Sequence, residues 1–452
     1  MATRDGRDEG VAWEGGSVSV DVAAAPALPK RMLRAGSTTP ERLRRVAVIL
    51  MVGCLVTAVV SVLGGLAHTD AVRASGTRIA AVTPDAAELY RSLADADATA
   101  TSGYVSGGLE SAPVRARYDA DIARAADRLV HAASRLPEGD PAADQVATIG
   151  AQLPVYTGLI ETARVHNRLG LPLGQSYLDS ASRVMRSTIL PAVEQLRQRQ
   201  IAALAAAYQR GSAIPFAVLL IGAAVLAGVI DHAVLERRRT NRVLNTGLVA
   251  AGVALVAALL WWAITVAVVG DRLNNARQHS DAATALDDAR VAVLQARSNE
   301  SLVLVARNSG GGSSEQGFTT QLERVLGPGD AGGLLAEAQR SATSAPRIAA
   351  IRATTVDWRA AHRHVRELDD GGQYRPAIAS VTGADPAGSG AAFARLDAAL
   401  GSAIDIERQA FTADATRADA ALTGLTAGPA GLALLAAAAV TMGIGRRVGE
   451  YR

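Results

Sequence analysis

The sequence predicts an all-α membrane protein with four transmembrane helices and two external four-helix bundles, arranged as a parallel tandem repeat. The first observation is that apolar residues gather in four uncharged runs. Each run is long enough for a bilayer core of ~30 Å, which needs about 20 residues. The second is that the two long segments between runs are alanine-rich and are broken at intervals by glycine and proline. Because only helices and closed barrels satisfy backbone polar groups in lipid, unalternating runs of this length indicate helices.

Composition narrows the class of protein further. The chain has 452 residues, of which 49% are apolar, 20% charged and 4% aromatic, with a net charge of +3. The four apolar runs exclude a purely soluble protein. The single cysteine, Cys54, excludes a disulfide scaffold, a four-thiolate zinc site and a CxxC redox pair. The basic residues, almost all arginine, are offset by 43 acidic residues, so no basic face for nucleic acid is predicted.

The runs divide the chain into nine predicted segments. In order, they are a disordered basic cytoplasmic tail at 1–45, transmembrane helix 1 at 46–67, external bundle 1 at 68–212, transmembrane helix 2 at 213–235, a cytoplasmic arginine loop at 236–246, transmembrane helix 3 at 247–270, external bundle 2 at 271–422, transmembrane helix 4 at 423–445 and a cytoplasmic stub at 446–452.

Arginine near the short segments predicts the orientation, because cytoplasmic loops carry an excess of Lys and Arg. Basic residues precede the first run, fill the loop after the second and follow the fourth. All three segments are therefore expected in the cytoplasm, with both bundles outside the plasma membrane. A cleaved signal peptide is an alternative for the first run, but its basic lead and apolar core are longer than signal peptides have. The sequence Met51-Val52-Gly53-Cys54 loosely resembles a lipoprotein cleavage box, but the apolar core continues beyond it.

The sequence of each bundle has the residue spacing that is typical of packed helices. In the first, breaks near 107–113, 137–141 and 170–174 leave four helical stretches, and the outer two are expected to continue into the membrane. Seam residues spaced by four and three are typical of helix packing. They are Leu89, Leu93, Ala96, Ala100, Gly103 and Gly107, with Val291, Leu294, Ser298, Ser301 and Val305 in the second bundle. Two packed bundles in one chain would form an internal pseudo-dimer. A homo-oligomer is the alternative.

Several polar residues need an interpretation. Five in a row, Arg297 to Ser301, indicate two solvated faces beside a small-residue seam, and a polar layer inside the bundle is the alternative. His362 and His364 project in different directions on a helix, so we interpret them as solvated or capping residues rather than ligands of one metal. The alternation of Asp95, Asp97, Thr99 and Thr101 with alanine does not predict one acidic pocket. Trp261 and Trp262 are expected to anchor the outer half of the third transmembrane helix.

No Walker loop, dinucleotide fingerprint, HExxH, GxSxG or kinase signature is present in the sequence. No catalytic, metal or cofactor residue is predicted, and we expect a protein that is not an enzyme. The leading hypothesis is a transmembrane signal transducer. A cell-envelope scaffold or assembly protein and, less favoured, a transporter are the alternatives.

One stretch resembles a known family. Residues 156–164 (YTGLIETAR), 167–170 (NRLG) and 172–174 (PLG), with Tyr177, Leu178 and Met185, are similar to the outer domain of an actinobacterial family of four-span membrane signalling proteins, the GlnX-like proteins. The resemblance implies external bundles and two partners. One is an extracytoplasmic solute-binding lipoprotein that binds amino acids, and the other is a cytosolic Ser/Thr kinase, protein kinase G. It therefore implies amino-acid sensing.

Candidate partner contacts follow from the topology. Turns that point away from the bilayer are candidates for an external partner: Gly107, Gly108, Pro113, Gly170, Gly174, Gln175, Gly310, Ser314, Gly371 and Tyr374. The short loop supplies candidates for an acidic cytoplasmic partner: Arg237, Arg238, Arg239 and Arg242.

Overall fold

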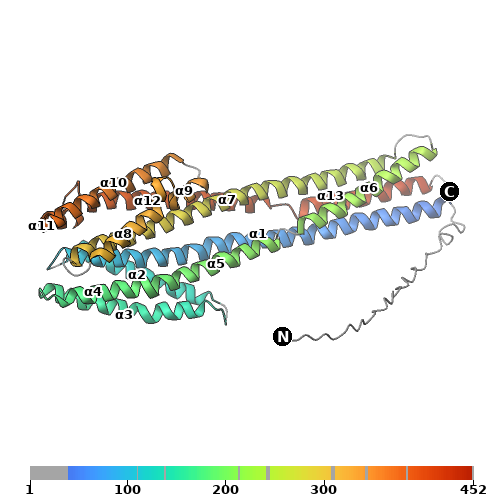
Figure 1. Ribbon diagram of the computed structural model, residues 1–452. Helices are drawn as coiled ribbons and strands as arrows, with labels where there is room; N and C mark the ends of the chain where they lie inside the picture. The colour runs from blue at the N-terminus through green and yellow to red at the C-terminus, as the bar shows by residue number, and fades with distance from the viewer. Residues whose placement is uncertain are drawn as a thin grey trace, which may run out of the picture.

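The computed structural model describes residues 39–108, 110–136, 139–211, 214–240, 245–306, 311–341, 345–382 and 385–449, and every regular element in these ranges is a helix (Figure 1). The helices are α1 (Thr39–Val105), α2 (Ala112–Ser134), α3 (Ala143–Arg168), α4 (Leu173–Val184), the π-helical turn η1 (Met185–Ile189), α5 (Leu190–Gly211), α6 (Ile214–Thr240), α7 (Thr246–Ala306), α8 (Gly311–Leu326), the 3-10 turn η2 (Pro328–Asp330), α9 (Gly333–Ser341), α10 (Ala345–Asp370), α11 (Tyr374–Thr382), α12 (Ser389–Ala421) and α13 (Ala427–Gly449). The predicted all-α class is confirmed. The predicted tail falls almost entirely outside the described residues.

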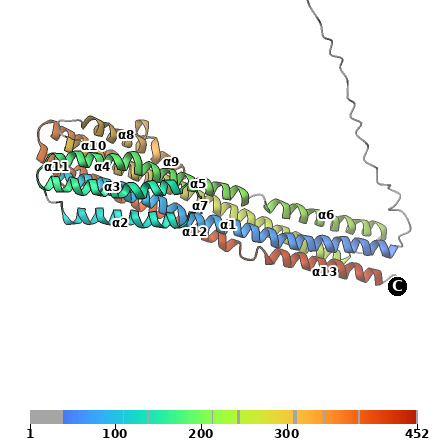
Figure 2. The ribbon, with the colours of Figure 1, turned by 90° about the horizontal axis from the view of Figure 1, so that it is seen from below.

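The molecule is elongated, with the shorter helices gathered at one end (Figure 1, Figure 2). At the other end, four helices are long and apolar enough to cross a membrane. These segments are Arg44–Asp70 of α1, Phe216–Leu235 of α6, a part of α7, and Ala427–Arg446 of α13. The chain is therefore an all-α membrane protein.

Small residues let the membrane helices pack closely. At the end where α7 begins, a Cβ built on Gly247 would lie 2.4 Å from the Cα of Gly443 on α13. Asn245, just before α7, donates a hydrogen bond from its side chain to the carbonyl of Gly443 at 3.2 Å. In lipid, helix association depends on such close approach and on hydrogen bonds between helices, because the hydrophobic effect does not favour association there.

Two helices run without a break from the membrane into the bundles. α1 has 67 residues and α7 has 61, so at 1.5 Å per residue each is about 90–100 Å long. The last helix of the second bundle is not continuous with the fourth membrane helix. α12 ends at Ala421 and α13 begins at Ala427, and between them Gly424 has φ +86°, a conformation that favours glycine. The corresponding junction between α5 and α6 includes residues 212–213, outside the described residues.

The two bundles share one apolar core, because α1 and α7 pack against each other. Seam residues of both helices, among them Leu89, Leu93, Val291 and Leu294, are at most 2% exposed and belong to this core. Nearly every residue of α7 between Ala282 and Leu304 is buried. A helix covered on all sides is an interior helix, and its many alanines allow neighbours to approach from every direction.

The two tryptophans of α7 differ in environment. Trp261 is 45% exposed and faces outward, next to Gly428 of α13. Trp262 is 1% exposed and packs with Val218, Val269 and Leu425. The interpretation of Trp262 as an interfacial anchor is therefore wrong, because it points into the contacts between helices.

Two prolines lie inside continuous helical segments of the first bundle. Pro154 is within α3, which runs on to Arg168. Pro191 is the second residue of α5, directly after the π-helical turn η1. A proline has no N–H for the carbonyl four residues earlier, and the wider π turn accommodates the missing bond.

Candidate functional site

Polar side chains form a buried layer across the shared core of the two bundles. We call this set the polar layer: Asp97 on α1, Tyr156 on α3, Ser182 on α4, Arg297 to Ser301 on α7, His362 on α10 and Ser389 on α12. Every member is at most 6% exposed. Burying polar groups is costly unless each finds a partner, so the pairing within the layer decides whether it is stable.

The first half of the polar layer is centred on Asp97. Its Oδ1 accepts hydrogen bonds from Ser182 Oγ at 2.8 Å and from Tyr156 Oη at 3.5 Å. Its Oδ2 accepts one from Ser298 Oγ, on α7 in the other bundle, at 2.8 Å. Burial raises the pKa of Asp97, although the Arg186 charge and these hydrogen bonds oppose the rise. The three hydroxyls thus hold the Asp97 carboxyl group inside the core at the boundary between the bundles.

Two further contacts cross this boundary. The hydroxyls of Ser102 on α1 and Ser301 on α7 lie 3.2 Å apart. Arg186, in the π-helical turn, donates from Nη1 to Oδ1 of Asn299 at 2.5 Å. π turns often occur at functional sites because they re-aim side chains on an otherwise regular helix. Here the turn carries the arginine that contacts α7.

The second half of the polar layer is centred on Glu300, which is 0% exposed. Arg297 Nη1 lies 2.5 Å from its Oε2, and His362 Nδ1 lies 3.1 Å from its Oε1. Ser389 donates a hydrogen bond to Oε1 and in turn accepts one from Trp358 Nε1 at 2.9 Å. Arg297 also donates to the carbonyl of Val381. This carboxylate therefore has a cation on one side and donors on the other.

The charges of Glu300 and His362 depend on each other. Burial alone would raise the pKa of Glu300, but the Arg297 guanidinium and the His362 bond hold it at about 2. Burial alone would lower the pKa of His362, but Glu300 and Glu315 raise it to about 9. His362 also stacks on the Phe318 ring, with centroids 3.6 Å apart. At neutral pH the core holds a histidinium between two carboxylates.

These contacts correct two interpretations from the sequence. The stretch from Arg297 to Ser301 is not solvated, because both bundles cover α7, and it forms the polar layer that was the alternative. His362 is 2% exposed and paired, whereas His364 is solvent-facing, as predicted. The polar residues of α1 that alternate with alanine do point to different sides of the helix. Asp97 is nevertheless buried, because α7 covers the side on which it lies. In the part of the chain that the structure describes, no group of three His, Cys, Asp or Glu side chains is arranged to hold a metal ion.

A small polar cavity of about 130 Å³ lies at the end of the first bundle farthest from the membrane. It lies where the α1–α2 turn meets the end of α3, and Tyr104, Glu110, Arg115, Arg164, Asn167 and Arg168 line it. Arg164 Nε lies 3.0 Å from Glu110 Oε2, and its guanidinium lies 4.2 Å from the centre of the Tyr118 ring. Arg168 is exposed and has no ion pair to a described residue. The cavity therefore presents both charge signs to solvent.

Some of the residues predicted to contact an external partner are exposed, and others are half-buried or buried. In the first bundle Gly107, Gly108 and Gly170 are exposed with positive φ, and Gly108 lines the cavity. Pro113 is the second residue of α2 and is exposed, and Gln175 is half-buried. Gly174 is buried against Tyr104 and His166, so it shapes the turn and offers no contact surface.

In the second bundle Gly371 is exposed, Ser314 is half-buried, and Tyr374 donates a hydrogen bond to the carbonyl of Leu304 at 3.4 Å. Gly310 lies outside the described residues. Among the predicted cytoplasmic contacts, Arg237 and Arg238 are exposed at the end of α6. The Arg239 side chain and Arg242 also lie outside the described residues.

The first bundle matches the model of a known domain family. Residues 71–209 match the family model of the actinobacterial sensor domain. The match spans the bundle part of α1 and the helices α2 to α5, and so includes Asp97, Tyr156 and Ser182 of the polar layer. No curated protein and no solved structure matches the chain. The findings support an actinobacterial sensor protein in a membrane.

Proposed function

We propose that the protein is a non-enzymatic signal transducer of the plasma membrane, which relays an external signal to a cytoplasmic partner. The observation that carries this proposal is the course of α1 and α7. Each runs unbroken from the membrane into the bundles, and the polar layer joins the two. A displacement of one helix inside the bundles is therefore carried along a stiff rod to the other side of the bilayer.

The polar layer favours a change between discrete positions over gradual sliding. If α1 shifts along α7, Asp97 loses Ser298 and Ser102 loses Ser301. A buried polar group without a partner costs about 1–3 kcal/mol, so intermediate positions are disfavoured. Packed interfaces of this kind switch between arrangements and do not deform continuously.

We propose that the signal enters at the distal end, through an amino-acid-binding lipoprotein. The exposed turns at Gly107, Gly108 and Gly170 and the cavity beside them support this. Arg168 and Arg115 offer donors for a carboxylate, and Glu110 offers an acceptor for an ammonium group. The cavity thus suits a zwitterion or a charged turn of a partner protein.

The signal leaves, in this proposal, at the loop between α6 and α7, toward a Ser/Thr protein kinase. Arg237 and Arg238 are exposed there, and Arg239 and Arg242 follow in the sequence. An acidic partner surface would be drawn to this loop and would bind more weakly in high salt.

Cross-linking with mass spectrometry tests the proposal, using the full chain in nanodiscs with the lipoprotein and the kinase of its source organism. On addition of the twenty amino acids, cross-links to the lipoprotein are expected at the distal turns, with a change in kinase cross-links at the arginine loop. Arg168→Glu at the cavity should weaken the external cross-links, while Arg183→Glu, an exposed α4 residue paired with Asp179, serves as the matched control.

Replacing the four loop arginines by glutamine separates the alternatives. A transducer keeps its external cross-links and loses the response of the kinase. A scaffold for outer partners shows no stimulus-dependent change in kinase cross-links, either in wild type or in the loop variant. Amino-acid flux into liposomes would show a transporter, and either of these two results overturns the proposal.

A further inference from the structure

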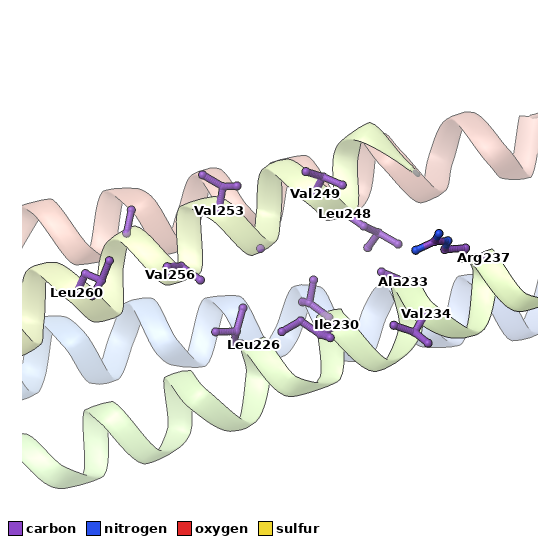
Figure 3. Close-up of a pocket in the computed structure, with 13 residues that line it drawn as sticks. Leu226, Ile230, Ala233, Val234, Arg237, Leu248, Val249, Val253, Val256 and Leu260 are labelled. Carbon is purple, nitrogen blue, oxygen red and sulfur yellow. The ribbon is translucent and has the colours of Figure 1, made fainter. Parts of the chain in front are cut away.

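An open groove lies between α6 and α7 near the loop that joins them (Figure 3). Its volume is about 610 Å³, and of its thirteen lining residues only Arg237 is polar. In Figure 3, Leu226 and Ile230 of α6 and Leu248 of α7 point into the space between the helices, and the Arg237 guanidinium lies at one end.

The described chain leaves this groove uncovered. Val253 is 65% exposed and Leu260 is 55% exposed, although both line it. A Cβ built on Gly252 would meet no atom within 4 Å. Because these residues lie within the membrane-length part of α7, the groove faces lipid.

The dimensions of the groove fit one leaflet. From Leu248 to Leu260 a helix rises about 18 Å, close to half of the ~30 Å hydrocarbon core. An extended acyl chain matches this length.

The charge at the end of the groove selects the headgroup. Arg237 is exposed and has no ion pair to a described residue. A guanidinium binds phosphate oxygens with two parallel hydrogen bonds, and basic pockets between transmembrane helices favour anionic lipids. We propose that the groove binds one anionic glycerophospholipid, with an acyl chain between α6 and α7 and its phosphate on Arg237.

Native mass spectrometry of the full chain in detergent tests this, with phosphatidylglycerol and phosphatidylcholine of identical acyl chains as probes. Wild type is expected to retain one phosphatidylglycerol in preference to phosphatidylcholine. Gly252→Leu fills the groove and should lower retention at least about fivefold. Gly431→Leu is the matched control, because a Cβ there also meets nothing within 4 Å but lies on α13.

Charge is tested separately from shape. Arg237→Gln should lower the preference for phosphatidylglycerol about fivefold, the ratio given by about 1 kcal/mol for one basic residue. Arg446→Gln, an exposed arginine at the end of α13, should leave the preference unchanged. Equal retention of both lipids by wild type, or unchanged retention in Gly252→Leu, overturns the proposal.

The competing occupant is a helix of a second copy. With Cys54→Ala to remove the native thiol, Val253→Cys would form a disulfide-linked dimer on oxidation in membranes if two grooves met. A lipid-filled groove leaves the chain monomeric under the same treatment. Dimer formation would overturn the proposal.

Discussion

Ser298 on α7 donates a hydrogen bond to the carboxyl group of Asp97 on α1 at 2.8 Å, across a sequence separation of 201 residues. Ser298 is 1% exposed and Asp97 is 3% exposed. The bond therefore joins the two halves of the chain inside their common core, where water cannot replace it.

Removing this bond should loosen the boundary between the bundles. Ser298→Ala leaves Asp97 with the hydroxyls of Ser182 and Tyr156 only, and we expect a loss of about 1–3 kcal/mol of unfolding free energy. Thermal unfolding of the full chain in detergent measures it. Ser402→Ala, at an exposed position of α12, is the control and should have an effect near zero. Equal effects of the two variants would contradict the importance of the bond.

His362 gives a pH-dependent prediction. Its folded pKa of about 9 lies above the ordinary value of 6.5. Its contribution is therefore fully present below pH 6.5 and is lost as the pH rises through 9. The shift corresponds to about 3 kcal/mol. His362→Gln should lower the unfolding midpoint at pH 6 by roughly 3–5 °C, and the difference from wild type should shrink by pH 9.5.

His364→Gln is the control for that series, because His364 is exposed on the same helix. Its midpoint should follow wild type at every pH. If the loss in His362→Gln were the same at pH 6 and pH 9.5, the charged state of His362 would not be the source of its stabilisation.

The contact between α13 and Trp261 predicts a steric effect. A Cβ on Gly428 would lie 2.9 Å from Trp261 Cζ2, whereas one on Gly431 meets nothing within 4 Å. Gly428→Val should force Trp261 or α13 to move, at about 1–3 kcal/mol, and Gly431→Val should not. The unfolding midpoint reports the difference, and identical behaviour of the two variants would refute the packing described.

One glycine inside α3 and one just after its end should respond oppositely to alanine. Gly170 has φ +70°, and Gly158 lies within the helix, with no atom near either built Cβ. Gly170→Ala should destabilise by about 1 kcal/mol because of backbone strain. Gly158→Ala should stabilise by up to about 1 kcal/mol, because glycine is a poor helix former. Unfolding midpoints that move in the same direction would contradict the turn geometry.

The helices could be predicted from the sequence, but the way in which they pack around particular polar side chains could not. Apolar length predicted the membrane segments, and the spacing of Leu89, Leu93 and Ala96 predicted a buried seam. The burial of Glu300 could not be predicted, because it depends on how α10 and α12, distant in the sequence, pack against α7. The π-helical turn had one sequence signal, Pro191, whose missing N–H marks where the α-helical bonding changes.

The central claim is that α1 and α7 carry a displacement across the membrane, and a distance measurement at the far side tests it. Spin labels are placed on Arg44→Cys and Thr246→Cys, at the membrane ends of α1 and α7, with Cys54→Ala to remove the native thiol. Pulsed electron–electron double resonance in nanodiscs measures the distance between the two labels with and without amino acids and lipoprotein. The account predicts a shifted distance distribution once the external partner is bound. Identical distributions while the partner is demonstrably bound would contradict it.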